Sequence, residues 1–142
     1  MERDLTDAIA GLHEAGRIRT RWLPGMRIAE RTDLPGYSRG RVMSGNPNGG
    51  IRLLEWDTAP AGQRTWSPSG SGVLLLHVND PATLGCLLFL LREASGDPHA
   101  YVRTQAVATG MRWQAYWLDR CATADTEGEA LAAALIDLAR AA

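Results

Sequence analysis

Arginine is the residue type through which this chain is best equipped to bind a ligand. All fifteen basic residues are arginine, and lysine is absent. The guanidinium group is planar and donates paired hydrogen bonds to a phosphate or a carboxylate. Nine arginines lie in residues 16–66, where the net charge is +5, whereas residues 1–15 and 80–142 each carry −3. The distribution indicates an anion site in the first half, although a GC-rich coding sequence is the simpler explanation for the lack of lysine.

Tryptophans accompany these arginines in the sequence. The chain has five tryptophans and one phenylalanine. An indole ring can stack on a base or a cation while a neighbouring arginine binds the anionic group. We therefore predict a binding site for a small anionic ligand in this region, and the predicted contact residues are Arg17, Arg19, Arg21, Trp22, Arg41 and Trp56. The alternative is a solvated strand surface that binds nothing.

A second surface with suitable chemistry is predicted near the C-terminus. Residues 111–117 alternate between apolar and polar side chains, as a half-buried strand does. We expect the apolar face, which includes Trp113 and Trp117, to pack under helices. If the opposite face with Arg112, Gln114 and Tyr116 is exposed, it could stack a base and contact phosphate.

No residue pattern predicts a catalytic or metal centre. The three histidines and two cysteines are scattered, without the close spacing of zinc ligands, and no phosphate-binding loop or serine-hydrolase motif is present. We predict no cofactor and no metal, and we favour a non-enzyme. The catalytic alternative is a small nucleotide-signal hydrolase that uses His77 with Asp80 or Asp119. A further alternative is a nucleic-acid-binding accessory protein, although a net charge of −1 makes nucleic acid an unlikely partner.

The length of the chain and the composition of its N-terminus limit the class of protein it can belong to. A chain of 142 residues fits one compact domain. The charged N-terminus lacks the apolar core of a signal peptide, and the longest apolar stretch, residues 84–91, is far shorter than the ~20 residues that span a bilayer. We expect a cytoplasmic protein that does not bind membranes.

The first half is predicted to hold one helix and several short strands. Leu5, Ala8, Ile9 and Leu12 have helical spacing, which predicts a helix over residues 5–15, with Asp4 as N-cap and Gly16 after its end. Residues 59–72 are rich in Gly, Pro and Ser and are predicted to form a loop. The predicted strands are 17–22, 26–28, 41–44, 51–57 and 73–78, with 41–44 and 51–57 forming a hairpin.

The second half, residues 80–142, is predicted to be α-β-β-α. Asp80 and Pro81 begin a helix that ends before Gly96, two strands follow over 100–107 and 111–119, and Thr126 begins the last helix. The fold class is therefore α+β: a small curled antiparallel β region after an N-terminal helix, then the α-β-β-α half. We expect one compact unit, with possible sub-units 1–66 and 73–142. The helix over 80–94 is apolar nearly all round, so it could also form a homo-oligomer.

Three segments resemble uncharacterised small proteins of bacteriophages and prophages. These are Asp80-Pro81-Ala82-Thr83-Leu84-Gly85-Cys86-Leu87-Leu88, Arg92-Glu93-Ala94-Ser95-Gly96-Asp97-Pro98, and Thr126-Glu127-Gly128-Glu129-Ala130-Leu131. The second half is also distantly similar to a small α/β/α sandwich domain of phage proteins. The resemblance implies a phage origin and carries no known activity or residue roles.

Small phage accessory proteins often act against host defences, so the resemblance favours a counter-defence protein in the cytoplasm of the bacterial host. Together with the arginine and tryptophan pattern, it predicts a non-enzymatic protein that binds either a small anionic nucleotide signal or a host defence protein. The two partners remain alternatives at this point.

Overall fold

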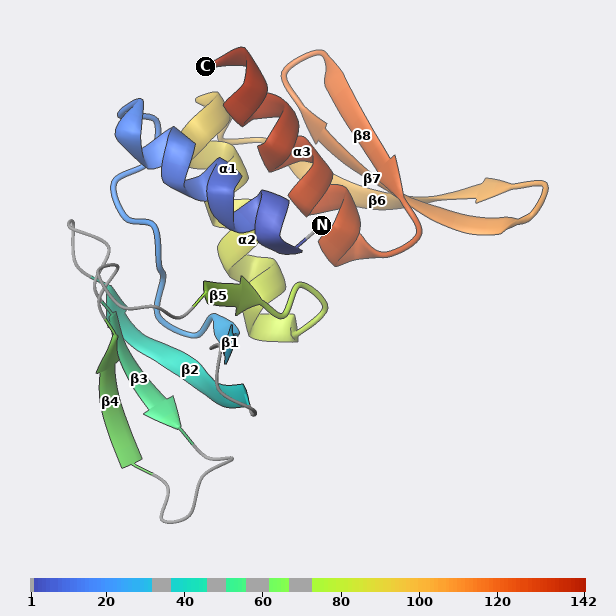
Figure 1. Cartoon of the computed structure of the whole chain (residues 1–142). Coiled ribbons are helices and arrows are strands. Elements are labelled where there is room, and N and C mark those ends of the chain that lie inside the picture. Colours follow the sequence, from blue (N-terminus) through green and yellow to red (C-terminus); the bar gives the residue numbers. More distant parts are fainter. Residues whose placement is uncertain (1, 32–36, 46–50, 56–61, 67–72) are drawn as a thin grey trace.

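The computed structural model describes residues 2–31, 37–45, 51–55, 62–66 and 73–142, which form three helices and two antiparallel sheets (Figure 1). Side chains are described for residues 4–28, 40–45 and 75–142. The helices are α1 (Glu2–Glu14), α2 (Pro81–Ser95) and α3 (Glu127–Ala141). The predicted α+β class is confirmed.

The first sheet has five strands in the order β4-β3-β2-β1-β5. Its strands are β1 (Arg27–Arg31), β2 (Tyr37–Gly45), β3 (Ile51–Glu55), β4 (Gly62–Trp66) and β5 (Val73–Leu76). Every neighbouring pair is antiparallel, so the predicted hairpin between 41–44 and 51–57 is confirmed as β2 and β3.

Two predictions for the first half are wrong. Residues 17–22 form no strand and belong to an irregular connection between α1 and β1, because they pair with none of the described strands, although Ile18 and Trp22 are buried in the core as predicted for one face of a strand. β4 lies inside the predicted loop 59–72, where its pairing with β3 overrides a glycine- and serine-rich composition that disfavours strands.

The second sheet has three strands in the order β6-β7-β8. They are β6 (Tyr101–Val107), β7 (Gly110–Trp117) and β8 (Arg120–Ala124). The predicted α-β-β-α order is therefore wrong by one strand, because β8 follows β7 after a two-residue turn. That turn includes Leu118, which has a φ of 52° and so occupies the left-handed region without being glycine.

The helix ends follow local side-chain chemistry. Asp80 caps α2 by accepting a hydrogen bond from the backbone N–H of Thr83 at 3.1 Å, and Gly96 ends the helix with a φ of 71°. Thr126 caps α3 by accepting from the N–H of Glu129 at 3.2 Å. The prediction of Asp4 as the N-cap of α1 is wrong, since that helix already begins at Glu2.

The helices lie between the two sheets, and the core takes residues from both halves of the chain (Figure 1). α3 packs on α1, α2, β7 and β8, while α1 packs on β5. The hairpin of β6 and β7 extends beyond the helices, and all its residues from 101 to 111 are exposed except Val102. Within the described residues, no helix combines the length and apolar character needed to cross a bilayer.

Candidate functional site

Three of the predicted contact arginines lie in the connection between α1 and β1. Arg17 and Arg19 are exposed, and Arg21 is half-buried. The backbone N–H of Arg19 donates to Glu93 Oε1 at 2.8 Å, which fixes this connection against the C-terminal half of α2. The side chains of Arg17 and Arg19 are therefore accessible to a ligand.

The two predicted tryptophan contacts cannot both be placed. Trp22 is 1% exposed and belongs to the core, so its ring has no face free to stack on a ligand. Trp56 lies outside the described residues. The sequence pattern does not separate a tryptophan that fills the core from one that lines a site.

Arg41 joins the first sheet to α2. Its Nη1 and Nη2 donate to the two carboxylate oxygens of Asp80 at 2.8 and 3.0 Å, and Nη1 also donates to the carbonyl of Gly25 at 2.6 Å. Asp80 in turn accepts from the hydroxyl of Thr83 at 3.0 Å, and that hydroxyl accepts from the N–H of Arg27 at 2.8 Å. These contacts form what we call the Arg41 joint.

The charges of the Arg41 joint stabilise each other. The hydrogen bond from Arg41 holds the pKa of Asp80 well below its usual range, against the opposing effect of burial, and the hydrogen bonds from Thr83 lower it further. The same pairing raises the pKa of Arg41. The carboxylate is 8% exposed. The geometry therefore commits this arginine to a carboxylate of the protein itself.

Two of the predicted contact residues, Arg19 and Arg41, are held near opposite ends of α2 by their hydrogen bonds. Arg41 binds Asp80 at the N-terminal end of α2, whereas the backbone of Arg19 binds Glu93 near its C-terminal end. Glu93 follows Asp80 by thirteen positions along α2, which is roughly 20 Å at 1.5 Å per residue.

The residues of the hydrolase alternative do not form a catalytic pair, although His77 and Asp80 share a turn in which the backbone N–H of Asp80 donates to the carbonyl of His77 at 3.2 Å. Both carboxylate oxygens of Asp80 are occupied by Arg41, and His77 is exposed beside it in the sequence. Asp119 lies in the turn between β7 and β8, which Asp97 ties to the far end of α2 through a hydrogen bond from the N–H of Leu118 at 2.7 Å. Among the described residues, no group of three histidine, cysteine or acidic side chains could hold a metal.

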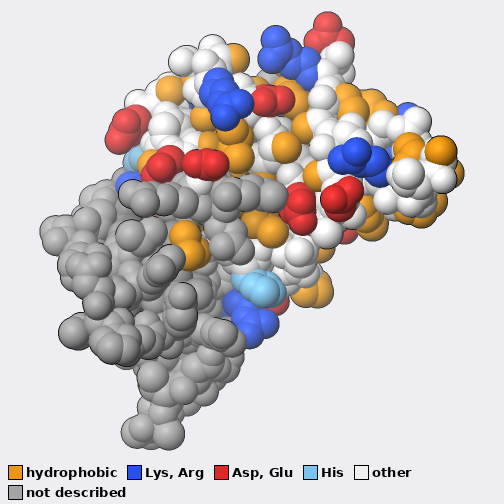
Figure 2. Space-filling view, turned by 45° about the vertical axis from the view of Figure 1, so that its right-hand side comes forward, with side chains coloured by type: hydrophobic (Ala, Val, Ile, Leu, Met, Phe, Trp, Pro, Cys, Tyr) orange, Lys and Arg blue, Asp and Glu red, His pale blue; other side chains and the backbone are white. Residues whose placement is uncertain are grey.

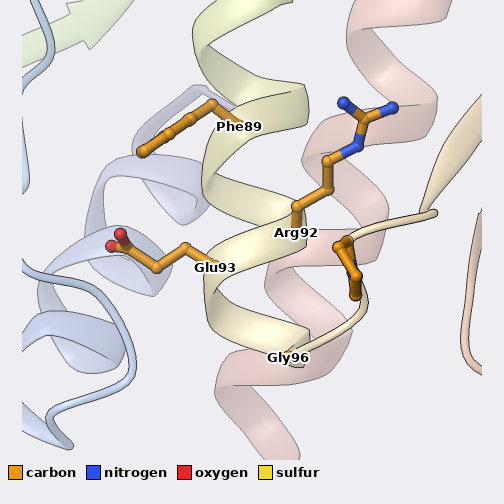
Figure 3. Close-up of a pocket in the computed structure, with 5 residues that line it drawn as sticks. Phe89, Arg92, Glu93 and Gly96 are labelled. Atoms are coloured by element: carbon orange, nitrogen blue, oxygen red, sulfur yellow. The ribbon is translucent and has the colours of Figure 1, made fainter.

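A shallow depression of about 420 Å³ lies at the C-terminal end of α2 (Figure 3). Phe89 and Glu93 point to one side of the helix and Arg92 to the other (Figure 3). Arg92 Nε donates to the carbonyl of Ala100 at 2.9 Å, and Glu93 accepts from Arg19. Its charged groups are thus bound to the protein's own backbone and do not converge on a ligand.

The outer face of β6 and β7 holds an ordered set of polar and aromatic side chains, which we call the open face: Tyr101, Arg103, Gln105, Gln114 and Tyr116. Arg103 Nη2 donates to Tyr116 Oη at 2.8 Å, and its Nε donates to Gln114 Oε1 at 3.3 Å. Its guanidinium carbon lies 4.7 Å from the centre of the Tyr116 ring. Tyr101 stacks on the same ring, with centroids 5.0 Å apart. The amide of Gln114 completes the set by donating to Gln105.

The charge of Arg103 is held by neutral groups. Within the part of the chain whose side chains are described, no carboxylate lies within ion-pairing distance of it, whereas the neighbouring Arg112 lies 3.7 Å from Asp125. Arg103 is exposed, and α3 packs on the opposite face of the sheet, where Ala115 and Trp117 are buried. The open face therefore offers a fixed, accessible guanidinium next to a tyrosine that is 44% exposed.

Only part of this surface was predicted from the sequence. The prediction included Arg112, Gln114 and Tyr116, which are half-buried, but not the three exposed residues opposite them on β6. The register places Arg103 opposite Gln114 and Tyr101 opposite Tyr116. The turn between β6 and β7 consists of Ala108 and Thr109, and Val107 pairs with Gly110 across it. A two-residue turn fixes which residues face each other across a hairpin, so placing it correctly would have given this register.

No known protein family, curated protein or solved structure matches the chain. The resemblance to phage proteins therefore stays a prediction.

Proposed function

We propose that this chain is a non-enzymatic binding protein whose ligand is a small anionic molecule of the nucleotide class, held on the open face. The observation that carries the proposal is the guanidinium of Arg103, which is exposed, fixed by Tyr116 and Gln114, and not neutralised by any described carboxylate. Following the resemblance to phage proteins, we further propose that it sequesters a nucleotide signal in the cytoplasm of a bacterial host.

The open face suits such a ligand for two physical reasons. A guanidinium that is already held in place loses little conformational freedom when it binds, so more of the interaction energy appears as affinity. Phosphate is its preferred partner, since charge-assisted hydrogen bonds to phosphate are stronger than those between neutral groups. The exposed ring of Tyr101 provides the apolar surface on which a base can stack.

The proposal is tested by calorimetric titration of the protein with AMP, with adenosine and with inorganic phosphate. We expect AMP to bind more tightly than either part alone. Arg103→Gln should weaken AMP binding about 10- to 100-fold, the equivalent of losing a hydrogen bond to a charged group. It should leave adenosine binding unchanged, because Arg103 contacts the phosphate.

Arg19→Gln is the matched control, since Arg19 is also exposed and its ordered contact is made by the backbone. It should bind AMP as the unmodified protein does. Absence of AMP binding, or unchanged affinity in Arg103→Gln, would overturn the proposal. Loss of AMP binding in Arg19→Gln alone would place the binding site at the arginines of the first half of the chain instead.

A host protein is the second candidate partner, and the end of the β6–β7 hairpin favours it. Met111 is 58% exposed and Val107 is 37% exposed. Hydrophobic side chains gather on the surface at this end of the molecule (Figure 2). Methionine, tyrosine and arginine are enriched at protein interfaces. A single host protein that copurifies with the tagged chain, and is lost in Met111→Asp but not in the control Leu118→Asp, would support this candidate. An intact nucleotide released by heat at about one per chain would support the first.

A further inference from the structure

In the part of the chain that the structure describes, no strand pairs with the outer edge of β6. β6 and β8 are the two edges of the second sheet, and α3 packs across one face of it, mainly on β8 and β7 and less on β6. β6 has seven residues, pairs with β7 without a bulge and contains no proline. Natural edge strands are usually protected from pairing by bulges, prolines or several charges. Arg103 is the only charged residue in β6.

The hairpin geometry decides which backbone groups are free at this edge. Val107 pairs with Gly110 across a two-residue turn, so these two exchange hydrogen bonds. Hydrogen-bonded and non-hydrogen-bonded pairs alternate along an antiparallel ladder. The N–H and C=O groups of Val102, Thr104 and Ala106 therefore point away from β7, toward the open edge.

We propose that β6 pairs antiparallel with β6 of a second copy, around a two-fold axis at Thr104. This register sets Thr104 opposite Thr104 of the partner subunit, and Val102 opposite Ala106 of the partner subunit. All three residues on the edge then exchange their free backbone hydrogen bonds. The two three-stranded sheets become one sheet of six strands.

The side chains of β6 are self-complementary in this register. Arg103 faces Gln105 of the partner subunit, so the one charge on the strand meets a neutral hydrogen-bond acceptor. Tyr101 faces Val107 of the partner subunit, and both are exposed in the single chain. Moving the axis by one residue to Arg103 would instead set two guanidinium groups directly opposite each other, which is destabilising. Charge therefore disfavours the register at Arg103, and the register at Thr104 is the one that pairs all three residues of the free edge.

The pairing also joins the two open faces, because a two-fold axis perpendicular to the sheet leaves the same face exposed on both copies. The two Arg103 Cα atoms would lie roughly 8 Å apart, from a strand spacing of about 4.8 Å and a rise of about 3.4 Å per residue. This arrangement suits a ligand with two anionic groups, such as a dinucleotide. That last step rests on the proposed function, whereas the pairing itself does not.

The test is sedimentation equilibrium of the full chain without nucleotide, so that a failure of ligand binding does not affect the result. We expect a monomer–dimer equilibrium. Thr104→Pro removes a backbone N–H that points away from β7, so the hairpin is preserved and the dimer is lost. Thr104→Val keeps the N–H and is the matched control, which should dimerise as before. Circular dichroism would establish that both variants fold.

A second variant tests the register even if Thr104→Pro fails to fold. Gln105→Glu places a carboxylate opposite Arg103 of the partner subunit, so it should tighten the dimer at least severalfold at low salt and lose this gain at high salt. A monomer at every concentration would overturn the proposal. So would a dimer that survives Thr104→Pro and is broken by Phe89→Glu, since Phe89 is an exposed residue of α2 and would place the interface on that helix.

Discussion

Arg41 and Arg103 show how differently one residue type is used in the two halves of the molecule. Both lie on strands, and both are held by several hydrogen bonds. Arg41 binds a carboxylate that is 8% exposed, so its charge is neutralised within the protein. Arg103 is held by a tyrosine and a glutamine, which fix its position without neutralising it. An arginine is thus available for a ligand when the fold holds its side chain through neutral partners, which leave its charge unpaired within the described residues.

The comparison predicts opposite effects of substitution on stability and on binding. The Arg41 joint holds β2, the start of α2 and the turn at Gly25 together, so its loss should be felt by the whole fold. The open face lies on a hairpin that extends away from the helices, where few buried contacts depend on it (Figure 1). Substitutions there should change affinity and leave stability nearly unchanged.

The largest expected effect is the loss of stability in Asp80→Ala. This change removes the N-cap of α2 and leaves Arg41 without its carboxylate, and we expect it to lower the free energy of unfolding by about 3 kcal/mol. Urea unfolding measures the effect. Asp137→Ala, an exposed aspartate on α3, is the control and should change it by about 0.5 kcal/mol or less. Equal losses in the two variants would show that the Arg41 joint contributes no more to the free energy of unfolding than an exposed aspartate does.

A somewhat smaller loss is expected where α3 meets the segment before α2. A Cβ atom on Gly128 would collide with the carbonyl of Val78, and backbone cannot move aside as a flexible side chain can. Gly128→Ala should therefore cost about 2 kcal/mol. Gly85→Ala is the matched control, because Gly85 is an exposed helical glycine with nothing within 4 Å of the added atom. That variant should be more stable by about 0.5–1 kcal/mol, and destabilisation of both would remove the steric explanation.

Acid should weaken the Arg41 joint in particular. The pKa of Asp80 is lowered in the folded protein, chiefly by its hydrogen bond from Arg41. Its contribution to stability is therefore complete above the unfolded-state pKa of about 3.9 and is lost as the pH falls below that value. We expect the free energy of unfolding to fall between pH 5 and pH 3, and to fall less in Asp80→Asn. An identical fall in that variant would assign the acid sensitivity to other carboxylates, such as Asp97, whose pKa is lowered by hydrogen bonds from the N–H groups of Leu118 and His99.

The sequence predicts best the features that local chemistry determines. The start of α2 at Asp80 and Pro81, its end at Gly96 and the start of α3 at Thr126 all depend on residues within one helical turn of each other. β8 was not predicted because the turn that precedes it is stabilised by a residue far away in the sequence. Leu118 has no sequence signal for a positive φ, and Asp97, which binds its N–H, lies 21 residues earlier.

The candidate site was harder to predict because pairing partners lie far apart in the sequence. The role of Arg41 follows from Asp80, which lies 39 residues away, and the role of Trp22 follows from the core that surrounds it. An alternation of arginines with apolar residues over 17–22 looked like a strand, although the structure has none there. The pairing of Arg103 with Gln114 could have been predicted from the sequence, because the local turn of the hairpin fixes it.

The smallest expected effect on stability tests the comparison most directly. Arg103→Gln removes contacts made by an exposed side chain, so the free energy of unfolding should stay within about 0.5 kcal/mol of the unmodified protein. Arg41→Gln, the same change at the Arg41 joint, leaves Asp80 buried without its partner and should cost about 2 kcal/mol. Both are measured by urea unfolding at pH 7, where the carboxylates are ionised. If Arg103→Gln is as destabilising as Arg41→Gln, the network of Tyr116 and Gln114 exists to hold the hairpin together, and Arg103 belongs to the fold in the same way as Arg41.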